Sequence, residues 1–510
     1  MGSTVARRLQ RPVAVFVTAL LVGVTVVLPI SRVAFGINSQ SMNVLARSDT
    51  WILLGRTFTL ALCVTAMALV IGVPLGALFA RARLVFRRLL LAIHALPLFL
   101  PPLVVALGWF HLFGERGLIG SPRTSALLFG PLGMVLILTT AFVPVVTFLT
   151  MLGILGLDPS LEEAAVIAAQ PARVVRRILI PAALPQVTFA ALIVFALAVA
   201  EVGVPMFLRV NVYGASVFAR LGGVEFSPGE AAALSLPMIG VALVLVLVER
   251  KLTNTAGSPR LRTTARMPLN LGHGPTVFVA LAAFVSLAPL VAICARGVSG
   301  LLHVSEWLGA NVTNSLVVSG VAALVATFMG IVTGESLARG CRSSRVLDVV
   351  LVAAFFVPSA VLGTGLVGTW NRPATQWVYG SLAIVVLPLV ARYSALAVRT
   401  FAASVGNTSR NYDEAAAIAG ANYVRRMTRL VIPMHTRSLI AAFGLVLVFC
   451  LRDLESTVMF YPPGGETLTV RLFTLEANGP QSVVAAIALI QITLTLGIIG
   501  LGVFSLRKVR

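Results

Sequence analysis

The chain carries a polar, arginine-bearing stretch, Asn411-Tyr412-Asp413-Glu414-Ala415-Ala416-Ala417-Ile418-Ala419-Gly420, that continues to Leu430-Val431-Ile432-Pro433 between two long apolar runs. An earlier stretch repeats it: Ser160-Leu161-Glu162-Glu163-Ala164-Ala165-Val166-Ile167-Ala168-Ala169, ending at Ile178-Leu179-Ile180-Pro181. Alanine-rich runs favour helix, and Ser160 with Glu163, like Asn411 with Glu414, has the spacing of a capped helix start. One such stretch could be an ordinary loop at a membrane surface. Two copies in corresponding places indicate a repeated functional element.

Composition places the chain in a membrane. Of its 510 residues, 58% are hydrophobic and 11% are charged, and the mean hydropathy is +0.98. Soluble domains carry about 25% charged residues, so an all-α polytopic membrane protein is predicted. The net charge of +21 could suggest nucleic acid in a soluble protein. Because the bases cluster between apolar runs, we expect them to set membrane orientation, with lipid and not nucleic acid as a partner.

Hydropathy predicts twelve transmembrane helices in two parallel six-helix repeats, since about 20 apolar residues cross a bilayer. The first apolar run, after Arg7, Arg8 and Arg11, is expected to be an uncleaved helix and not a signal peptide. The expected spans lie near 12–34, 52–80, 89–113, 127–150, 184–208, 231–249, 275–296, 312–336, 347–370, 377–398, 438–460 and 482–505.

The arginines predict the orientation. With both termini in the cytoplasm, 28 of the 39 bases fall in cytoplasmic segments and 11 on the other side, as the positive-inside rule requires. This places both repeated stretches in the cytoplasm. The count treats Arg392 as lying near the inner end of its span, and Glu335 is expected in the same position, so that both side chains would reach the interface.

The repeat divides the chain into a first unit, residues 1–250, a cytoplasmic linker, 251–274, and a second unit, 275–510. The polar stretches, which we name the first and second coupling segments, cover about 158–181 and 409–433. Gly72 and Gly76 match Gly330 and Gly334, 258 residues later, and small residues four apart let helices approach closely. Prolines near the middle of the third and ninth spans permit kinks there: Pro97, Pro101, Pro102 and Pro358.

Charges at membrane depth are candidate pathway residues, because burying them is costly. Glu201 and Asp453 lie 252 residues apart, the same interval as Pro181 and Pro433, and are expected in the outer parts of helices 5 and 11. With Glu455, they are our candidates for the translocation path. The alternative is that Arg452 pairs with a carboxylate and only fixes helix packing.

No catalytic or cofactor chemistry is predicted for this chain. Neither Lys251 nor Lys508 follows the glycine pattern of a phosphate-binding loop. The four cysteines form no C-x-x-C pair, so packing is their expected role. The five histidines are scattered, which predicts no metal site: His94, His111, His273, His303 and His435.

Both coupling segments resemble the EAA loop of inner-membrane permeases of binding-protein-dependent ABC importers. The second copy has the whole pattern, and the first departs from it at Ala169, where glycine is expected, and is one residue shorter between its glutamate and its proline. The resemblance implies the type I permease fold and an ATPase-coupling role for Glu163, Ala164, Ala165, Ala169 and Pro181 and for Glu414, Ala415, Ala416, Gly420 and Pro433.

The resemblance further implies a transport subunit of the bacterial inner membrane. Two copies of a cytoplasmic ATPase would bind ATP and Mg, and a periplasmic or lipid-anchored solute-binding protein would deliver the cargo.

The segments Glu201-Val202-Gly203-Val204-Pro205 and Tyr461–Arg471 are similar to ferric-iron-type fused permeases. Ferric iron is thus the expected cargo, with thiamine, phosphonate, polyamine or sulfate as alternatives. A twelve-helix secondary transporter and a membrane-embedded enzyme are the rival classes.

We predict that Glu414→Arg uncouples transport while leaving the protein inserted, because it reverses the charge of a helix that would dock in a groove of the ATPase. Uptake by the variant, normalised to its amount in the membrane, checks this. Wild-type uptake by a well-expressed variant would contradict it.

Overall fold

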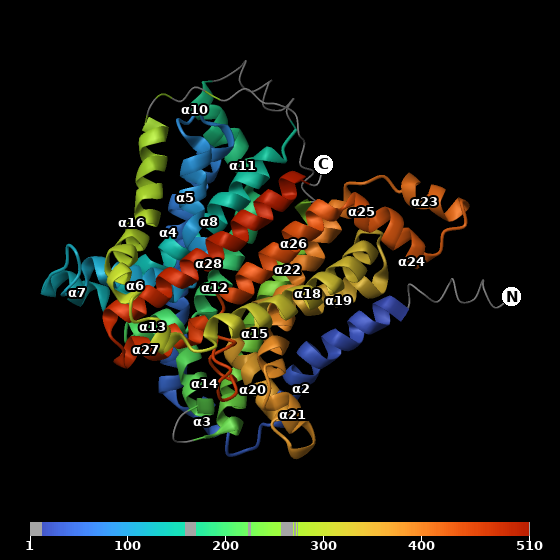
Figure 1. The fold of residues 1–510 in the computed structure, drawn as a ribbon. Coiled ribbons are helices and arrows are strands. Elements are labelled where there is room, and N and C mark those ends of the chain that lie inside the picture. The colour runs from blue at the N-terminus through green and yellow to red at the C-terminus, as the bar shows by residue number, and fades with distance from the viewer. Residues whose placement is uncertain are drawn as a thin grey trace.

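The computed structural model describes residues 13–158, 170–222, 226–256, 269, 272 and 274–508. This part of the chain is helical, apart from loops and one isolated bridge between Ala82 and Leu269. The chain forms one layered bundle in which the long helices run roughly alongside one another (Figure 1). The predicted all-α polytopic fold is confirmed.

Eight helices in the described residues are long and apolar enough to cross a membrane, and four bent helix pairs raise the number to twelve. The eight unbroken ones are Val13–Phe35, which includes α2 (Leu28–Phe35); α4 (Ser48–Arg81); α8 (Pro131–Leu155); Pro228–Leu252 within α15 (Pro228–Ala256); α16 (Gly274–Gly300); α18 (Asn311–Ala338); α22 (Ala383–Gly406); and α28 (Gln481–Lys508).

Prolines break the third and ninth spans instead of only kinking them. The chain turns by 108° between α5 (Arg87–Phe99) and α6 (Pro102–Phe113), and again by 108° between α19 (Arg342–Phe356) and α20 (Ser359–Trp370). The residue before a proline avoids the helical region, and Leu100 and Val357, each directly before a proline, are extended. Each span is therefore two half-helices that meet at the middle of the bundle.

The fifth and eleventh spans bend where the coupling segments join them. Residues Ala172–Ala182 meet α12 (Leu184–Ala200) at 65°, and Tyr423–Met434 meet α26 (Thr436–Leu451) at 80°. A π-helical turn precedes each bend, at η2 (Val175–Leu179) and η4 (Met427–Val431). The predicted ranges 184–208 and 438–460 were too long: α12 ends at Ala200 and α26 at Leu451.

Glycines let corresponding helix pairs touch in both halves. A Cβ atom on Gly76 in α4 would lie 2.6 Å from the Thr147 carbonyl oxygen of α8, and one on Gly334 in α18 would lie 2.7 Å from the Val398 carbonyl oxygen of α22. Backbones this close require glycine. The repeated glycines therefore have the packing role that their spacing predicted.

The first helix of each half packs against the other half. In Figure 1, α16 lies along α5 and α6 of the first half, and α2 lies beside α20 of the second. A Cβ on Gly108 of α6 would lie 2.5 Å from the Pro289 carbonyl oxygen of α16, and one on Gly365 of α20 would lie 2.2 Å from the Pro29 carbonyl oxygen of α2. Each half thus packs its first helix against the other half, and we call this arrangement the exchange of the first helices. It was not apparent from the sequence.

We expect Gly334→Ala to reduce the free energy of unfolding by about 1–3 kcal/mol, the usual cost of overpacking. Its control is Gly320→Ala in the same helix, where a Cβ meets nothing within 4 Å. Denaturant unfolding in detergent, followed by circular dichroism, measures both. Equal stability of the two variants would contradict the close approach of α18 and α22.

Candidate functional site

The second coupling segment forms a short helix, α23 (Asn411–Ile418), that projects from one end of the bundle together with α24 (Tyr423–Arg426) and α25 (Ile432–Met434) (Figure 1). Glu414, Ala415 and Ala416 lie on α23. The predicted cap is wrong: Arg410 occupies the N-cap position and no side chain caps the helix. The side-chain cap is instead on α24, where the Asn422 side chain accepts a hydrogen bond from the Arg425 amide at 2.8 Å.

Gly420 ends α23 in a way that requires glycine. Its φ is +76°, in the left-handed region. The Gly420 amide donates to the Ala417 carbonyl at 3.0 Å and the Ala421 amide to the Ala416 carbonyl at 3.0 Å, which is the Schellman arrangement. A residue with a Cβ loses about 1–2 kcal/mol in this conformation. Gly420 therefore fixes the direction in which the chain leaves α23.

The first coupling segment lies partly outside the described residues. Glu163, Ala164, Ala165 and Ala169 fall in the range 159–169, which the structure does not describe. Pro181 lies in α11 (Ile180–Ala182), directly after a π-helical turn, as Pro433 does in α25. The two segments thus correspond where both are described.

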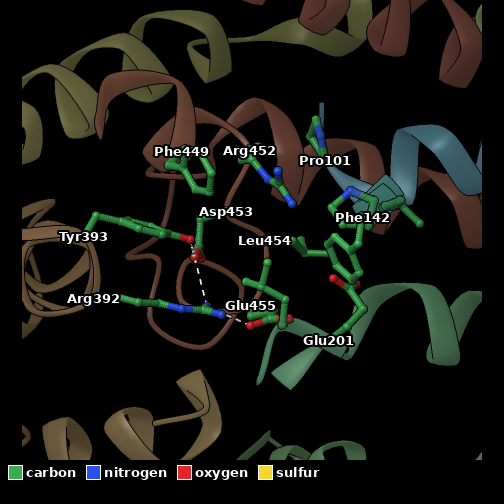
Figure 2. A pocket seen from close by; sticks show the side chains of 13 residues that line it. Pro101, Phe142, Glu201, Arg392, Tyr393, Phe449, Arg452, Asp453, Leu454 and Glu455 are labelled. Carbon is green, nitrogen blue, oxygen red and sulfur yellow. Dashed lines mark hydrogen bonds and ion pairs between the residues drawn. The ribbon is translucent and has the colours of Figure 1, made fainter. Parts of the chain in front are cut away.

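The predicted pathway residues meet in one buried cluster at the middle of the bundle. Glu201 follows α12, and Asp453 and Glu455 follow α26. The prediction that Glu201 and Asp453 lie inside the outer parts of their helices is therefore wrong. All three are at most 8% exposed. Figure 2 shows them around one small cavity with residues of α6, α8 and α22. The site is therefore built by both halves of the chain.

Arg392 of α22 is the main partner of the carboxylates. Its Nη1 lies 2.7 Å from Glu455 Oε2 and 3.2 Å from Asp453 Oδ2, and it also donates to the Ser359 hydroxyl at the start of α20. The Tyr393 hydroxyl donates to Asp453 Oδ2 at 2.6 Å. Because the arginine is 4% exposed, the expectation that Arg392 reaches the interface is wrong, and it does not belong to the cytoplasmic count.

Arg452 has a different partner from the one predicted. Its Nη1 donates to the backbone carbonyl of Leu98 near the end of α5, and no ion pair with a carboxylate is found for it in the described residues. Pro102 has no N–H to donate to this carbonyl four residues earlier. Arg452 thus satisfies, from the second half, a carbonyl that the proline break leaves free in the first half.

Glu201 and Asp453 have equivalent backbone roles. Glu201 Oε1 accepts from the Val204 amide at 3.1 Å, and Asp453 Oδ1 accepts from the Ser456 amide at 2.7 Å. Each carboxylate caps the turn that follows its helix, three residues on. The 252-residue interval therefore marks two corresponding helix ends, and the same capping holds both carboxylates at the cavity.

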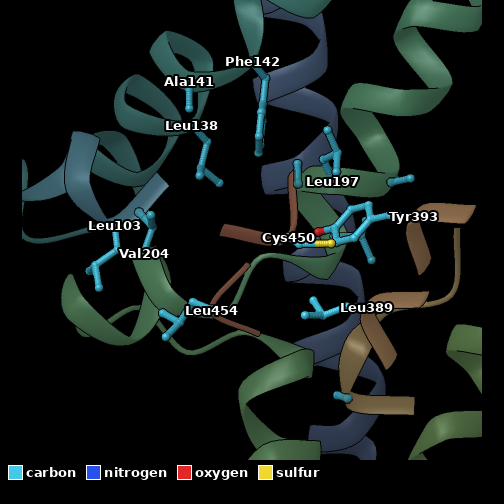
Figure 3. Packing of buried hydrophobic residues seen from close by; sticks show 14 of the residues in the cluster. Leu103, Leu138, Ala141, Phe142, Leu197, Val204, Leu389, Tyr393, Cys450 and Leu454 are labelled. Atoms are coloured by element: carbon cyan, nitrogen blue, oxygen red, sulfur yellow. The ribbon is translucent and has the colours of Figure 1, made fainter. Parts of the chain in front are cut away.

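The cavity at the cluster has a volume of about 30 Å³, which is room for one or two water molecules. Phe142, Leu197 and Leu454 pack around it in the apolar core shown in Figure 3, and Cys450 lies buried in the same core. A solute of more than a few atoms does not fit in this volume, so the space between the halves is closed at this level.

Sequence reasoning missed Arg392, Tyr393 and Ser359 as members of the cluster. The available signal was Arg392 itself, a charged residue inside an apolar run. Because the predicted span 377–398 ended soon after it, Arg392 was placed near the interface and not in the middle of the helix. Within the described residues, no group of three or more histidine, cysteine, aspartate or glutamate side chains could hold a metal ion. His94 instead bonds Thr147 at 3.0 Å, and His435 bonds Ser404 at 2.8 Å.

We predict that Arg392→Met destabilises the protein by about 3–5 kcal/mol, because it leaves Asp453 and Glu455 buried without their arginine. The control is the triple variant Arg392→Met, Asp453→Asn, Glu455→Gln, which removes the charges together and is expected to recover most of the loss. Thermal unfolding in detergent compares the three proteins. A triple variant no more stable than the single one would contradict this account.

Comparison with known proteins agrees with this architecture. The family described as "Binding-protein-dependent transport system inner membrane component" matches residues 72–212 and again 326–508. These two ranges cover more than half of the chain. Each includes a coupling segment and the helix end that bears Glu201 or Asp453.

Similar proteins are permeases of three named systems. The Fe(3+)-transport system permease protein FbpB 2 of Haemophilus influenzae is 22% identical over 487 residues, 92% of each chain. The molybdenum transport system permease protein ModB of Mycobacterium tuberculosis is 30% identical, over 36% of this chain and 72% of its own. A protein of Salmonella typhimurium with the provisional name 2-aminoethylphosphonate transport system permease protein PhnV is 26% identical, over 38% of this chain and 73% of its own. The chain therefore belongs to the inner-membrane permease family of binding-protein-dependent ABC importers, with the family's unit present twice.

Proposed function

We propose that this chain alone forms the translocation path of an ABC importer and serves two ATPase subunits, one at each coupling segment. The observation that carries the proposal is the buried cluster of Glu201, Arg392, Asp453 and Glu455, which both family-matched halves build where they meet. A path between two repeats is typical of transporters that alternate between two accessible states.

In the proposed cycle, ATP and Mg are bound by the partner subunits, and this chain hydrolyses nothing. Closing of the ATPase dimer moves the coupling segments, with Glu414 to Ala416 and their counterparts Glu163 to Ala165 in the docked helices. Ala169 and Pro181 in the first segment, and Gly420 and Pro433 in the second, set the direction in which the chain leaves each docked helix. Each partner must bind the two states with different affinity, or no transport is driven. The binding protein docks on the face opposite the coupling segments, and both termini lie in the cytoplasm.

We infer ferric iron as the first cargo to test. The relative that this chain covers most fully is named for Fe(3+) transport. The iron would pass as substrate, and specificity would come mainly from the binding protein.

An oxyanion is the second candidate. Relatives are named for molybdenum and for 2-aminoethylphosphonate. Arg392 lines the cavity, and its buried Nε has no hydrogen-bond partner in the described residues. A guanidinium N–H with spare capacity suits a phosphonate or molybdate oxygen.

Uptake into vesicles that hold the chain, its ATPase and its binding protein tests both candidates. We expect ATP-dependent uptake of labelled ferric iron that molybdate, 2-aminoethylphosphonate and thiamine do not inhibit. The control is the same assembly with an ATPase partner unable to hydrolyse ATP, which should give no uptake.

ATP-dependent uptake of one of the other solutes, with no iron uptake, would replace the cargo and keep the importer. Uptake that ignores ATP and follows an ion gradient would overturn the proposed function.

A further inference from the structure

The second coupling segment is held to the bundle by ion pairs. In the second half, charged side chains link α23 to the end of α18. Asp413, beside the Glu-Ala-Ala motif, pairs with Arg339 at the end of α18, and Asp413 Oδ1 lies 3.6 Å from Arg426 Nε. Arg426 Nη2 in turn lies 3.2 Å from Glu335 Oε1. We name these four residues the coupling chain.

The coupling chain is shielded from solvent at its inner end. The Glu335 side chain is 1% exposed, that of Arg426 is 19% exposed, and those of Arg339 and Asp413 are 13% exposed. Partly buried ion pairs are screened by salt less than pairs on an open surface. Arg426 contacts Glu335 of α18 and Asp413 of α23 together, so it joins the two helices.

The first half has apolar residues at two of the four matching positions, those of Glu335 and Arg426. Arg81 stands at the position of Arg339, and the counterpart of Asp413 lies outside the described residues. The interval of 258 residues that relates Gly334 to Gly76 places Ala77 at the position of Glu335. The interval of 252 that relates Pro433 to Pro181 places Val174 at the position of Arg426. Ala77 and Val174 are buried together in an apolar cluster with Ile154, Val175, Leu179 and Ala183.

We propose that the coupling chain is a positioning device that couples the second ATPase contact to the membrane helix α18 more firmly than the apolar residues of the first half would at the positions of Glu335 and Arg426. At these two positions the first half has only apolar contacts, whereas the second half has a hydrogen bond from Arg426 Nη2 to Glu335 Oε1 and ion pairs from Arg426 and Arg339 to Asp413. Glu335, Arg339, Asp413 and Arg426 are thus positioning residues for the helix α23 that docks. This rests on the proposed docking of the coupling segments.

The test is a variant that gives the second half the residues of the first, Glu335→Ala with Arg426→Val. The matched control is Arg425→Val, which removes the same charge from an exposed position on the same short helix, α24. In the full transport complex, we expect the double variant to retain both ATPase subunits but to transport at least fivefold less solute per ATP hydrolysed. The control should stay within twofold of the wild type.

A second measurement uses the full-length chain without the ATPase. A spin label on Ile418 of α23, where the native side chain is 88% exposed, reports how firmly α23 is held. We expect the label to become more mobile in the double variant and unchanged in Arg425→Val. Should the double variant fail to insert, Asp413→Asn alone is expected to raise the mobility, because it changes only the α23 end of the coupling chain.

Two results would overturn the proposal. One is wild-type transport per ATP in the double variant, and the other is unchanged label mobility in both the double variant and Asp413→Asn. A wild-type chain that fails to bind any ATPase would refute the proposed function instead, and the label mobility would still decide whether the coupling chain holds α23.

Discussion

Polar backbone groups inside a membrane must be paired, and this constraint explains where the site lies. A helix that breaks in hydrocarbon exposes carbonyl and amide groups at a cost of several kcal/mol each. Two spans break at prolines, and two further spans end at Glu201 and Asp453, near the same level. Arg452 satisfies the Leu98 carbonyl, and the two carboxylates cap the turns after their helices. The breaks are tolerable only because the halves bury them against each other.

The polar cluster follows from that arrangement. Once Asp453 and Glu455 are buried, they require a cation, and Arg392 of α22 supplies it. Ser359 and Tyr393 complete the hydrogen bonds, which a buried charge needs to be tolerated. The same groups that stabilise the broken helices thus line the cavity between the halves, so a packing role does not exclude the proposed pathway role.

The two halves share a backbone plan but differ in chemistry. Both have the proline break, the π-helical turn before the bend, the glycine contact between neighbouring spans and the exchanged first helix. The charges are unequal. The second half supplies both cluster arginines, and the positions of Glu335 and Arg426 are apolar in the first half. A fused chain permits this difference. Because both halves belong to one polypeptide, each half packs against the other and not against a copy of itself, so their residues can differ.

By itself, the sequence determined the all-α membrane class, the number of spans counted with their breaks, the two repeats and their glycine contacts, and the corresponding positions of Glu201 and Asp453 in the two halves. These depend on hydropathy, local helix preference and repeat spacing, which are all read along the chain. Only the tertiary structure decided that Arg392 and not Arg452 pairs with the carboxylates, that the first helices exchange, and that α23 is tied to α18. Those contacts join residues as far as 354 positions apart, and no local pattern specifies which distant side chain a buried charge will meet.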